Sequence, residues 1–151
     1  DGEGGRGGAD EGTRVTVLAG CGRPADGTGV DLRIVDVEVD GEGAATALPE
    51  GRVGEIWVSS PSCAGGYWGL HEETREAFGA RLADGSGPFL RTGDLGFLHG
   101  GELFVCGRAK DLIIVRGRNH YPQDIERACE AACPDLLRPG CSAAVGVPAL
   151  G

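Results

Sequence analysis

Short runs of apolar and β-branched residues, separated by Gly, Pro and Asp, make up the chain from residue 13 to residue 109. This pattern is typical of strands joined by tight turns. It predicts strands at Arg14–Leu18, Gly29–Val39, Val53–Ser59, Leu95–Leu98 and Glu102–Cys106. The last two flank His99-Gly100-Gly101 and predict a hairpin. Residues Glu72–Leu82 instead have helical spacing, with glutamates near the start, so we expect one short helix among the strands.

The pattern changes after residue 108. Leu112–Val115 predicts a short buried strand, which Gly117 interrupts, and Pro122 opens a predicted helix that stops before Pro134. The apolar positions of this helix recur at i, i+3, i+4 and i+7, at Ile125, Ala128, Cys129 and Ala132. A last strand is predicted at Cys141–Val147. We therefore expect an α+β chain, in which a β-rich part over residues 13–109 gives way to an α+β part over residues 110–151 that lacks a closing element.

Composition predicts a disordered N-terminal segment and argues against two classes of partner. Six of the first 12 residues are Gly and four are acidic, so residues 1–12 cannot bury enough apolar area to offset their ordering entropy. The 151-residue chain has a formal net charge of −9, which argues against nonspecific binding to nucleic acid or to an anionic membrane. No run approaches the roughly 20 apolar residues that span a bilayer. We find no export signal and predict a cytoplasmic location.

The six cysteines are predicted to be free thiols, because a chain without an export signal is expected in a reducing compartment. Cys129 and Cys133 stand four positions apart on the predicted helix, a spacing that could supply half of a zinc site. There is no CxxC and no His at ligand spacing, so packing as small apolar side chains is favoured. We predict no metal site in this chain.

Charge is distributed unevenly. Residues 1–58 contain 12 acidic residues and 5 arginines, whereas residues 108–118 contain 4 basic residues against Asp111 alone. A compact basic patch of this kind suits a small anion. A local cluster of salt bridges explains the charges equally well, so both interpretations stay open.

Two segments carry candidate chemistry. Thr92-Gly93-Asp94, predicted as a turn before a strand, presents a carboxylate that could hold the 2′ and 3′ hydroxyls of a ribose, although Gly-Asp is also common in ordinary turns. The predicted hairpin delivers Arg108 beyond its second strand, where a guanidinium can donate to ribose or phosphate oxygens. Lys110-Asp111 follows at the junction of the two parts. Such a charged pair could be a hinge or a surface ion pair.

Several motifs resemble those of the adenylate-forming superfamily of acyl- and aminoacyl-activating enzymes: Gly54–Val58 followed by Gly66-Tyr67-Trp68, then Arg91–Leu95 and Gly107–Glu126. Within that superfamily the chain is most similar to fatty acyl-AMP ligases, through Cys21–Pro24, Pro88–Leu98 and Arg116–Glu126. The resemblance extends over Val15–Pro148. It implies a small β-barrel-like subdomain at the end of the large N-terminal domain, then a hinge and the truncated start of the small C-terminal domain.

The resemblance also implies roles for individual residues. Asp94 would accept hydrogen bonds from the ribose of ATP, and Arg108 would contact the ribose or phosphate. Lys110, with Asp111, would form the hinge, and Gly117 would lie where a pantetheine arm approaches. The implied reaction joins a fatty acid to ATP, with Mg²⁺ as cofactor, to give acyl-adenylate and pyrophosphate. The acyl group then passes to the phosphopantetheine thiol of an acyl carrier protein or polyketide synthase module.

The family's phosphate loop, adenine-binding segment and catalytic lysine have no counterpart in the sequence. Lys110 is the only lysine, and its motif position is the hinge, so the catalytic lysine is expected beyond Gly151. We therefore predict no catalytic residue in this chain and expect the chain alone to be inactive. Two alternatives stay open. The chain could be a piece of an acyl-CoA ligase, or a noncatalytic module that docks a carrier protein.

Overall fold

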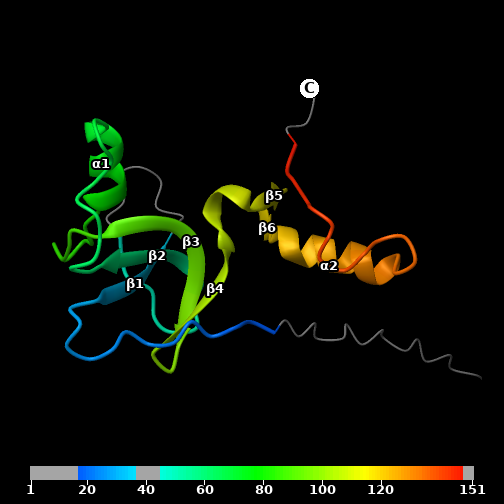
Figure 1. Cartoon of the computed structure of the whole chain (residues 1–151), viewed down its shortest axis with the longest axis horizontal. Coiled ribbons are helices and arrows are strands. Elements are labelled where there is room, and N and C mark those ends of the chain that lie inside the picture. The colour runs from blue at the N-terminus through cyan, green and yellow to red at the C-terminus, as the bar shows by residue number, and fades with distance from the viewer. Residues whose placement is uncertain (1–16, 37–44, 148–151) are drawn as a thin grey trace, which may run out of the picture.

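The structure is a computed structural model that describes residues 17–36 and 45–147 (Figure 1). Its elements in chain order are β1 (Asp31–Val35), β2 (Gly54–Ser59), α1 (His71–Phe78), β3 (Leu90–His99), β4 (Glu102–Arg108), the 3-10 turn η1 (Ala109–Asp111), β5 (Ile113–Val115), β6 (Arg118–His120) and α2 (Pro122–Ala132). The expected α+β class is confirmed. The disordered segment predicted over residues 1–12 lies outside the described residues.

Strands β1 to β4 form one antiparallel sheet in which the spatial order follows the chain order. The predicted hairpin is β3 and β4, and both strands are longer than predicted because pairing continues until Asp94 faces Arg108. Short segments bridge to the two edge strands, with Gly20 opposite Phe104 of β4 and Ala47 opposite Val35 of β1. Among the described strands β1 does not pair with β4, so the expected barrel-like closure is not found and the sheet is open.

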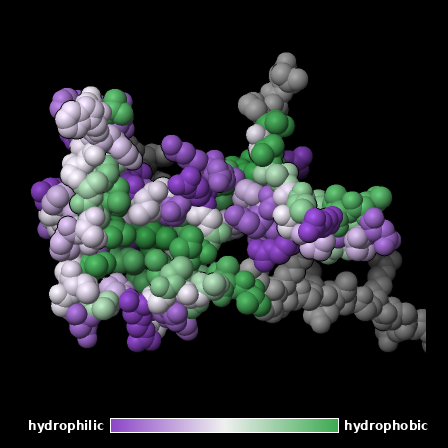
Figure 2. Space-filling view, viewed as in Figure 1, coloured by the Kyte–Doolittle hydropathy of each residue, from purple (hydrophilic) through white to green (hydrophobic). Residues whose placement is uncertain are grey.

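The hydrophobic core belongs to this sheet. Val35, Trp57, Leu82 and Phe89 pack together, and each is at most 7% exposed. The rings of Trp57 and Phe89 have their centroids 6.2 Å apart. Ile34 lies directly opposite Ile56, and both are buried on the face of the sheet opposite to Val35 and Trp57. Strands β1 and β2 are therefore covered on both faces. Figure 2 shows hydrophobic residues gathered over the sheet on the face turned to the viewer.

Helix α1 is shorter than the predicted helix. It ends at Phe78, where Gly79 donates its N–H to the carbonyl of Arg75. The chain then turns so that Ala80 bridges to Phe89, which places Leu82 in the core instead of on the helix. The prediction failed here because the same apolar spacing fits a helix and a segment that returns to a sheet. Neither α1 nor α2 has the length and hydrophobicity of a membrane span.

The predicted strand Cys141–Val147 is wrong, since these residues adopt no strand. The segment instead lies along α2, whose carboxylates hold the backbone within the segment and at the residue just before it. The N–H of Ala144 donates to Oε1 of Glu126 over 2.9 Å, and the N–H of Gly140 donates to Oε1 of Glu130 over 3.0 Å. These bonds satisfy backbone groups that a partner strand would otherwise satisfy.

The two predictions at the start of the chain fall partly outside the described residues. Of Arg14–Leu18, the described residues 17 and 18 are in no strand. The strand predicted at Gly29–Val39 is found as the shorter β1, and residues 37–39 of that prediction are not described.

The part after η1 is a two-stranded sheet, β5 with β6, followed by α2. Helix α2 begins at Pro122 and ends before Pro134, as predicted. The strand predicted at Leu112–Val115 is found as β5, but its predicted burial is wrong, because Ile114 is 66% and Val115 is 50% exposed. A two-stranded sheet has too few neighbours to cover its own faces. Figure 1 shows α2 extending away from the four-stranded sheet, with its first turn, at Gln123, close to Gly107 of β4.

Candidate functional site

The segment Thr92-Gly93-Asp94 lies inside β3 and not in a turn before a strand. The register on either side leaves these three residues of β3 opposite Ile56 of β2 alone, which makes them a β-bulge. Gly93 has a φ of 73°, in the left-handed region that favours glycine. The predicted turn is therefore wrong, since the Gly-Asp signal here marks a bulge with strand pairing on both sides.

Hydrogen bonds from side chains fix the shape of this bulge. Oγ1 of Thr92 donates to the carbonyl of Ile56 over 2.8 Å and accepts the N–H of Asp94 over 3.1 Å. The N–H of Gly93 donates to Oε1 of Glu55 over 3.2 Å. The bulge is thus tied to β2 at Thr92 and at Gly93, and Asp94 is tied to Thr92, which restricts where Asp94 can lie.

Glu55 is a charged residue in a buried position, only 5% exposed. Its Oε2 accepts hydrogen bonds from Nε1 of Trp57 over 3.0 Å, and from Nε and Nη2 of Arg91 over 3.1 and 2.9 Å. The guanidinium of Arg91 also lies 5.8 Å from the centre of the Trp57 ring. A buried carboxylate is tolerated when its charge and its lone pairs are compensated in this way.

Asp94 and Arg108 face each other across the β3–β4 ladder. Nε of Arg108 donates to Oδ1 of Asp94 over 3.0 Å. This hydrogen bond and the negative charge of Asp94 raise the pKa of Arg108. The side chain of Arg108 is 66% exposed and that of Asp94 is 37% exposed, so the pair remains accessible to a ligand. The two residues that the sequence nominated for a nucleotide are therefore neighbours.

A cleft of about 720 Å³ opens between β3, α1 and η1; Arg108 lines it, as do Thr92 and Gly93, whereas Asp94 next to them does not. Its basic lining residues are Arg91, Arg108 and Lys110, and its acidic lining residues are Glu55, Glu73, Glu76 and Asp111. The cleft therefore carries both signs of charge. Figure 2 shows hydrophilic residues gathered between the sheet and the second part of the chain. The basic patch predicted over residues 108–118 is divided between this cleft and the β5–β6 hairpin.

Curated proteins of known class resemble this chain, although no family model matches it. The chain is 64% identical over 86 residues to the medium-chain-fatty-acid–[acyl-carrier-protein] ligase JamA of Moorena producens, in an alignment of 56% of this chain and 14% of JamA. It is 44% identical over 124 residues to the long-chain-fatty-acid–AMP ligase FadD32 of Mycolicibacterium smegmatis, which covers 75% of this chain and 19% of FadD32. The chain thus spans only a small part of each relative.

Solved structures point the same way. A fatty acyl-adenylate ligase from E. coli or L. pneumophila matches with a TM-score of 0.62 and 36% identity, over 82% of this chain and 20% of that one. ATP-bound MatB from Rhodopseudomonas palustris matches with a TM-score of 0.59 and 36% identity, over 80% of this chain and 21% of MatB. The chain is homologous to part of the adenylate-forming enzymes. The resemblance noted in the motifs is thereby confirmed.

The remaining residues that the family suggests lie at and beyond the end of the cleft. Lys110 and Asp111 are in η1, which links the four-stranded sheet to the β5–β6 sheet. Gly117 is in the turn between β5 and β6 with a φ of 74°, and a side chain added there would meet nothing within 4 Å. The structure thus places the predicted hinge residues between two sheets and leaves open space around Gly117.

Sequence reasoning missed Glu55 and Thr92. Glu55 was noted only as part of the motif Gly54–Val58, and Thr92 only as part of a turn. A charged residue within an otherwise apolar strand, GEIWVS, was the available signal that β2 carries a special contact.

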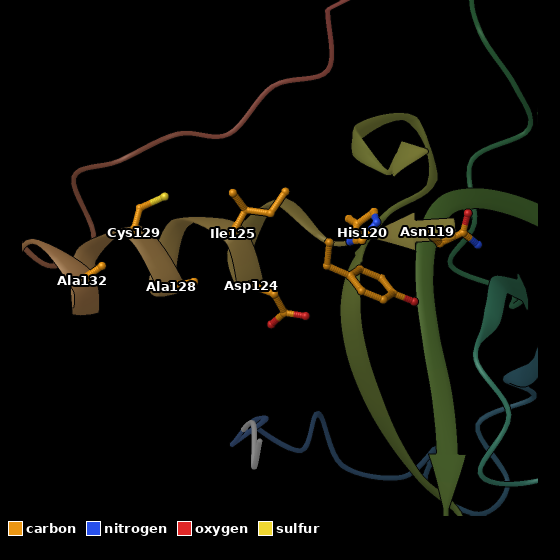
Figure 3. A pocket seen from close by; sticks show the side chains of 8 residues that line it. Asn119, His120, Asp124, Ile125, Ala128, Cys129 and Ala132 are labelled. Carbon is orange, nitrogen blue, oxygen red and sulfur yellow. The ribbon is translucent and has the colours of Figure 1, made fainter. Parts of the chain in front are cut away.

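The apolar face of α2 is present but open. Its four predicted positions, together with Asn119, His120, Tyr121 and Asp124, line a hollow of about 420 Å³. Figure 3 shows Ile125 and Cys129 on the same side of the helix. Cys129 and Cys133 are exposed, so their predicted packing as buried apolar side chains is wrong. Within residues 17–36 and 45–147, no three metal-ligating side chains gather in one place.

Proposed function

We propose that this chain is part of a longer ATP-dependent fatty acyl-AMP ligase, called here the parent protein. The observation that carries the proposal is the Asp94–Arg108 ion pair beside a cleft, in a chain homologous to part of the adenylate-forming enzymes. The parent protein joins a fatty acid to ATP and releases pyrophosphate. The acyl group then passes to the phosphopantetheine thiol of an acyl carrier protein or polyketide synthase module, a partner that the name of JamA supports.

Asp94 and Arg108 bind the nucleotide in this proposal. The carboxylate of Asp94 has two acceptor oxygens, enough for both hydroxyls of a ribose. The ion pair uses Nε of Arg108, so we assign its two amino groups to ribose or phosphate oxygens. Because the pair forms across neighbouring strands, the acceptor and the donor are set in place before the nucleotide arrives, which lowers the entropic cost of binding.

Lys110 and Asp111 form the hinge in this proposal. A 3-10 turn of three residues between two separate sheets is a short segment that can absorb a rotation. Gly117, on the far side of that hinge, leaves space for the pantetheine arm. We further propose that the parent protein is cytoplasmic, and that other parts of it close the four-stranded sheet into a barrel-like subdomain.

The chemistry itself is assigned to the rest of the parent protein. Lys110 is the only lysine of the chain, and we place it at the hinge, so the lysine that stabilises the developing adenylate belongs elsewhere. In the described part of the chain, no three His, Cys, Asp or Glu side chains lie close enough together to hold Mg²⁺. We therefore expect this chain by itself to catalyse no adenylation.

Replacing Asp94 tests the ribose role. In the parent protein we expect Asp94→Ala to raise the Kd for ATP by about tenfold or more, the effect of losing hydrogen bonds to a charged acceptor. Isothermal titration calorimetry measures this constant. Asp31→Ala is the matched control, because Asp31 is a half-exposed partner of Arg33 on the same sheet. An ATP affinity that Asp94→Ala leaves unchanged contradicts the proposal.

Stiffening the hinge tests the role of Lys110. We expect Lys110→Pro to slow acyl transfer to the thiol more than ATP–pyrophosphate exchange, because proline fixes φ at a position that must rotate. Lys110→Ala, which leaves the backbone free, is the control. Equal losses in both half-reactions would speak against a hinge at this residue.

The two alternatives are separated by product and by binding. A coenzyme A thioester as the main product of the parent protein identifies an acyl-CoA ligase. Binding of a carrier protein without any affinity for nucleotide identifies a noncatalytic docking module.

A further inference from the structure

Glu55 occupies a position where a strand ordinarily buries an apolar residue. It lies on β2 between Val35 of β1 and Leu95 of β3, both of which are buried. A carboxylate at such a place is unfavourable unless its oxygens are matched by donors. A valine or isoleucine would fill the space without that requirement, so the bonds made by the carboxylate need an explanation of their own.

The two oxygens of Glu55 have different partners. Oε2 takes the donors of Trp57 and Arg91, which compensate the charge and fasten β2 to β3. Oε1 accepts the backbone N–H of Gly93. Pairing with Arg91 alone would suffice for an ion pair that only joined two strands. The bond to Gly93 instead connects this carboxylate to the centre of the bulge.

The position of Asp94 follows from that bond. Glu55 holds the peptide group before Gly93, and the φ of 73° at Gly93 then turns the chain. Thr92 accepts the N–H of Asp94, and the carboxylate of Asp94 meets Arg108. A shift of the Gly93 peptide would therefore move the carboxylate of Asp94 relative to Arg108 and the cleft.

We infer that Glu55 is a positioning residue for the nucleotide site, which holds the bulge through Gly93 so that Asp94 keeps the place where it accepts the ribose hydroxyls. This inference rests on the proposed function, because it assumes that Asp94 binds ribose. Glu55 acts on the nucleotide through Asp94 and not by direct contact.

Discrimination between ATP and 2′-deoxyATP tests the inference in the parent protein. The ratio of kcat/KM for these two nucleotides, measured by pyrophosphate exchange, reports how well Asp94 engages the 2′ hydroxyl. We expect Glu55→Gln to lower this ratio about tenfold, as when one hydrogen bond to a charged group is weakened. A substitution that merely reduced the folded fraction would lower both rates and leave the ratio unchanged.

Leu82→Val is the matched control, since Leu82 is buried in the same core and lies in the segment after α1, outside β2 and the bulged strand β3. It should lower the Tm and preserve the ratio. Glu55→Asp serves if Glu55→Gln does not fold, because it keeps the charge but is one methylene too short to reach both Gly93 and Arg91. The ratio should fall for this variant too.

These measurements separate the positioning role of Glu55 from the ribose role of Asp94. If Asp94→Ala abolishes the discrimination and the folded Glu55 variants retain it, the positioning role is overturned and the proposed function stands. If Asp94→Ala itself retains the wild-type ratio, or the wild-type parent protein does not discriminate, then the ribose role fails and the inference fails with it.

Discussion

The chain buries very different amounts of apolar surface on the two sides of η1. Before it, seven apolar side chains are buried: Ile34, Val35, Ile56, Trp57, Leu82, Phe89 and Leu95. After residue 111, the described chain buries Pro122 alone. Both sides contain apolar runs in sequence, IWV on β2 and LIIV at residues 112–115. The difference shows that an apolar run becomes a core only where neighbouring strands cover it.

This contrast has an energetic meaning. The four-stranded sheet removes enough apolar surface from water to offset much of its own ordering entropy. A two-stranded sheet and a helix of 11 residues are each marginal alone. We therefore expect the sheet to unfold as one cooperative unit, with the β5–β6 hairpin and α2 contributing little to its stability. The following predictions test that expectation, from the largest effect to the smallest.

The largest difference is expected between Phe89→Ala and Ile125→Ala. Phe89 is 1% exposed, so its truncation should lower the free energy of unfolding by about 3–5 kcal/mol. Ile125 lies on the open face of α2, so Ile125→Ala should lower the free energy of unfolding by less than about 1 kcal/mol. Denaturant titration followed by the fluorescence of buried Trp57 measures both. Similar losses in the two variants would mean that the parts fold together.

A smaller difference is expected between two glycines with the same backbone conformation. Gly93 and Gly117 have φ values of 73° and 74°, and a Cβ at either would meet nothing within 4 Å. Alanine should therefore cost each site the same local energy, about 1–2 kcal/mol. We expect Gly93→Ala to lower the stability of the sheet by that amount and Gly117→Ala to leave it unchanged. A loss of sheet stability in Gly117→Ala would show coupling across η1.

The smallest effect concerns pH and the segment that lies along α2. The hydroxyl of Ser142 and the N–H of Gly140 both donate to Glu130 and hold the pKa of its carboxyl below the ordinary value. A lowered folded-state pKa gives stabilisation that is present above the ordinary pKa of a glutamate and is lost as the pH falls through the lower, folded-state pKa. We expect the protection factor of the Gly140 amide, which is its intrinsic exchange rate divided by its observed rate, to fall at acidic pH. The protection factor of the Leu48 amide, which is bonded to a carbonyl, should not fall. NMR hydrogen exchange measures both amides.

Elements with strong local signals could be predicted from the sequence. The glycine pair between two apolar runs identified the β3–β4 hairpin, and that hairpin by itself implies that Asp94 and Arg108 approach each other. Pro122 and the i, i+3, i+4, i+7 spacing identified α2 and its apolar face. These features depend on a few neighbouring residues, so local reasoning is enough.

Features that depend on distant partners could not be predicted. The bulge at Thr92-Gly93-Asp94 exists because β2 continues to pair on both sides of it, and Gly-Asp alone does not separate a bulge from a turn. The contact of Glu55 with Gly93 spans 38 positions and has no periodic signature. The segment Cys141–Val147 has the composition of a strand, but Glu126 of α2 takes up the backbone N–H of Ala144.

The bulge leaves the faces of β3 on either side of it in agreement with β2. Strand β3 carries two residues more than β2 between the pairs Glu55–Leu95 and Trp57–Arg91. Directly paired residues share a face of the sheet, so Arg91 and Leu95 lie on one face together with Glu55. Loss of one residue from 92–94 would still leave a bulge, of the one-residue kind that Cys106 forms in β4. Arg91 would then keep its place opposite Trp57, so the acid in the core would keep its cation and only the loop of chain that carries Asp94 would change.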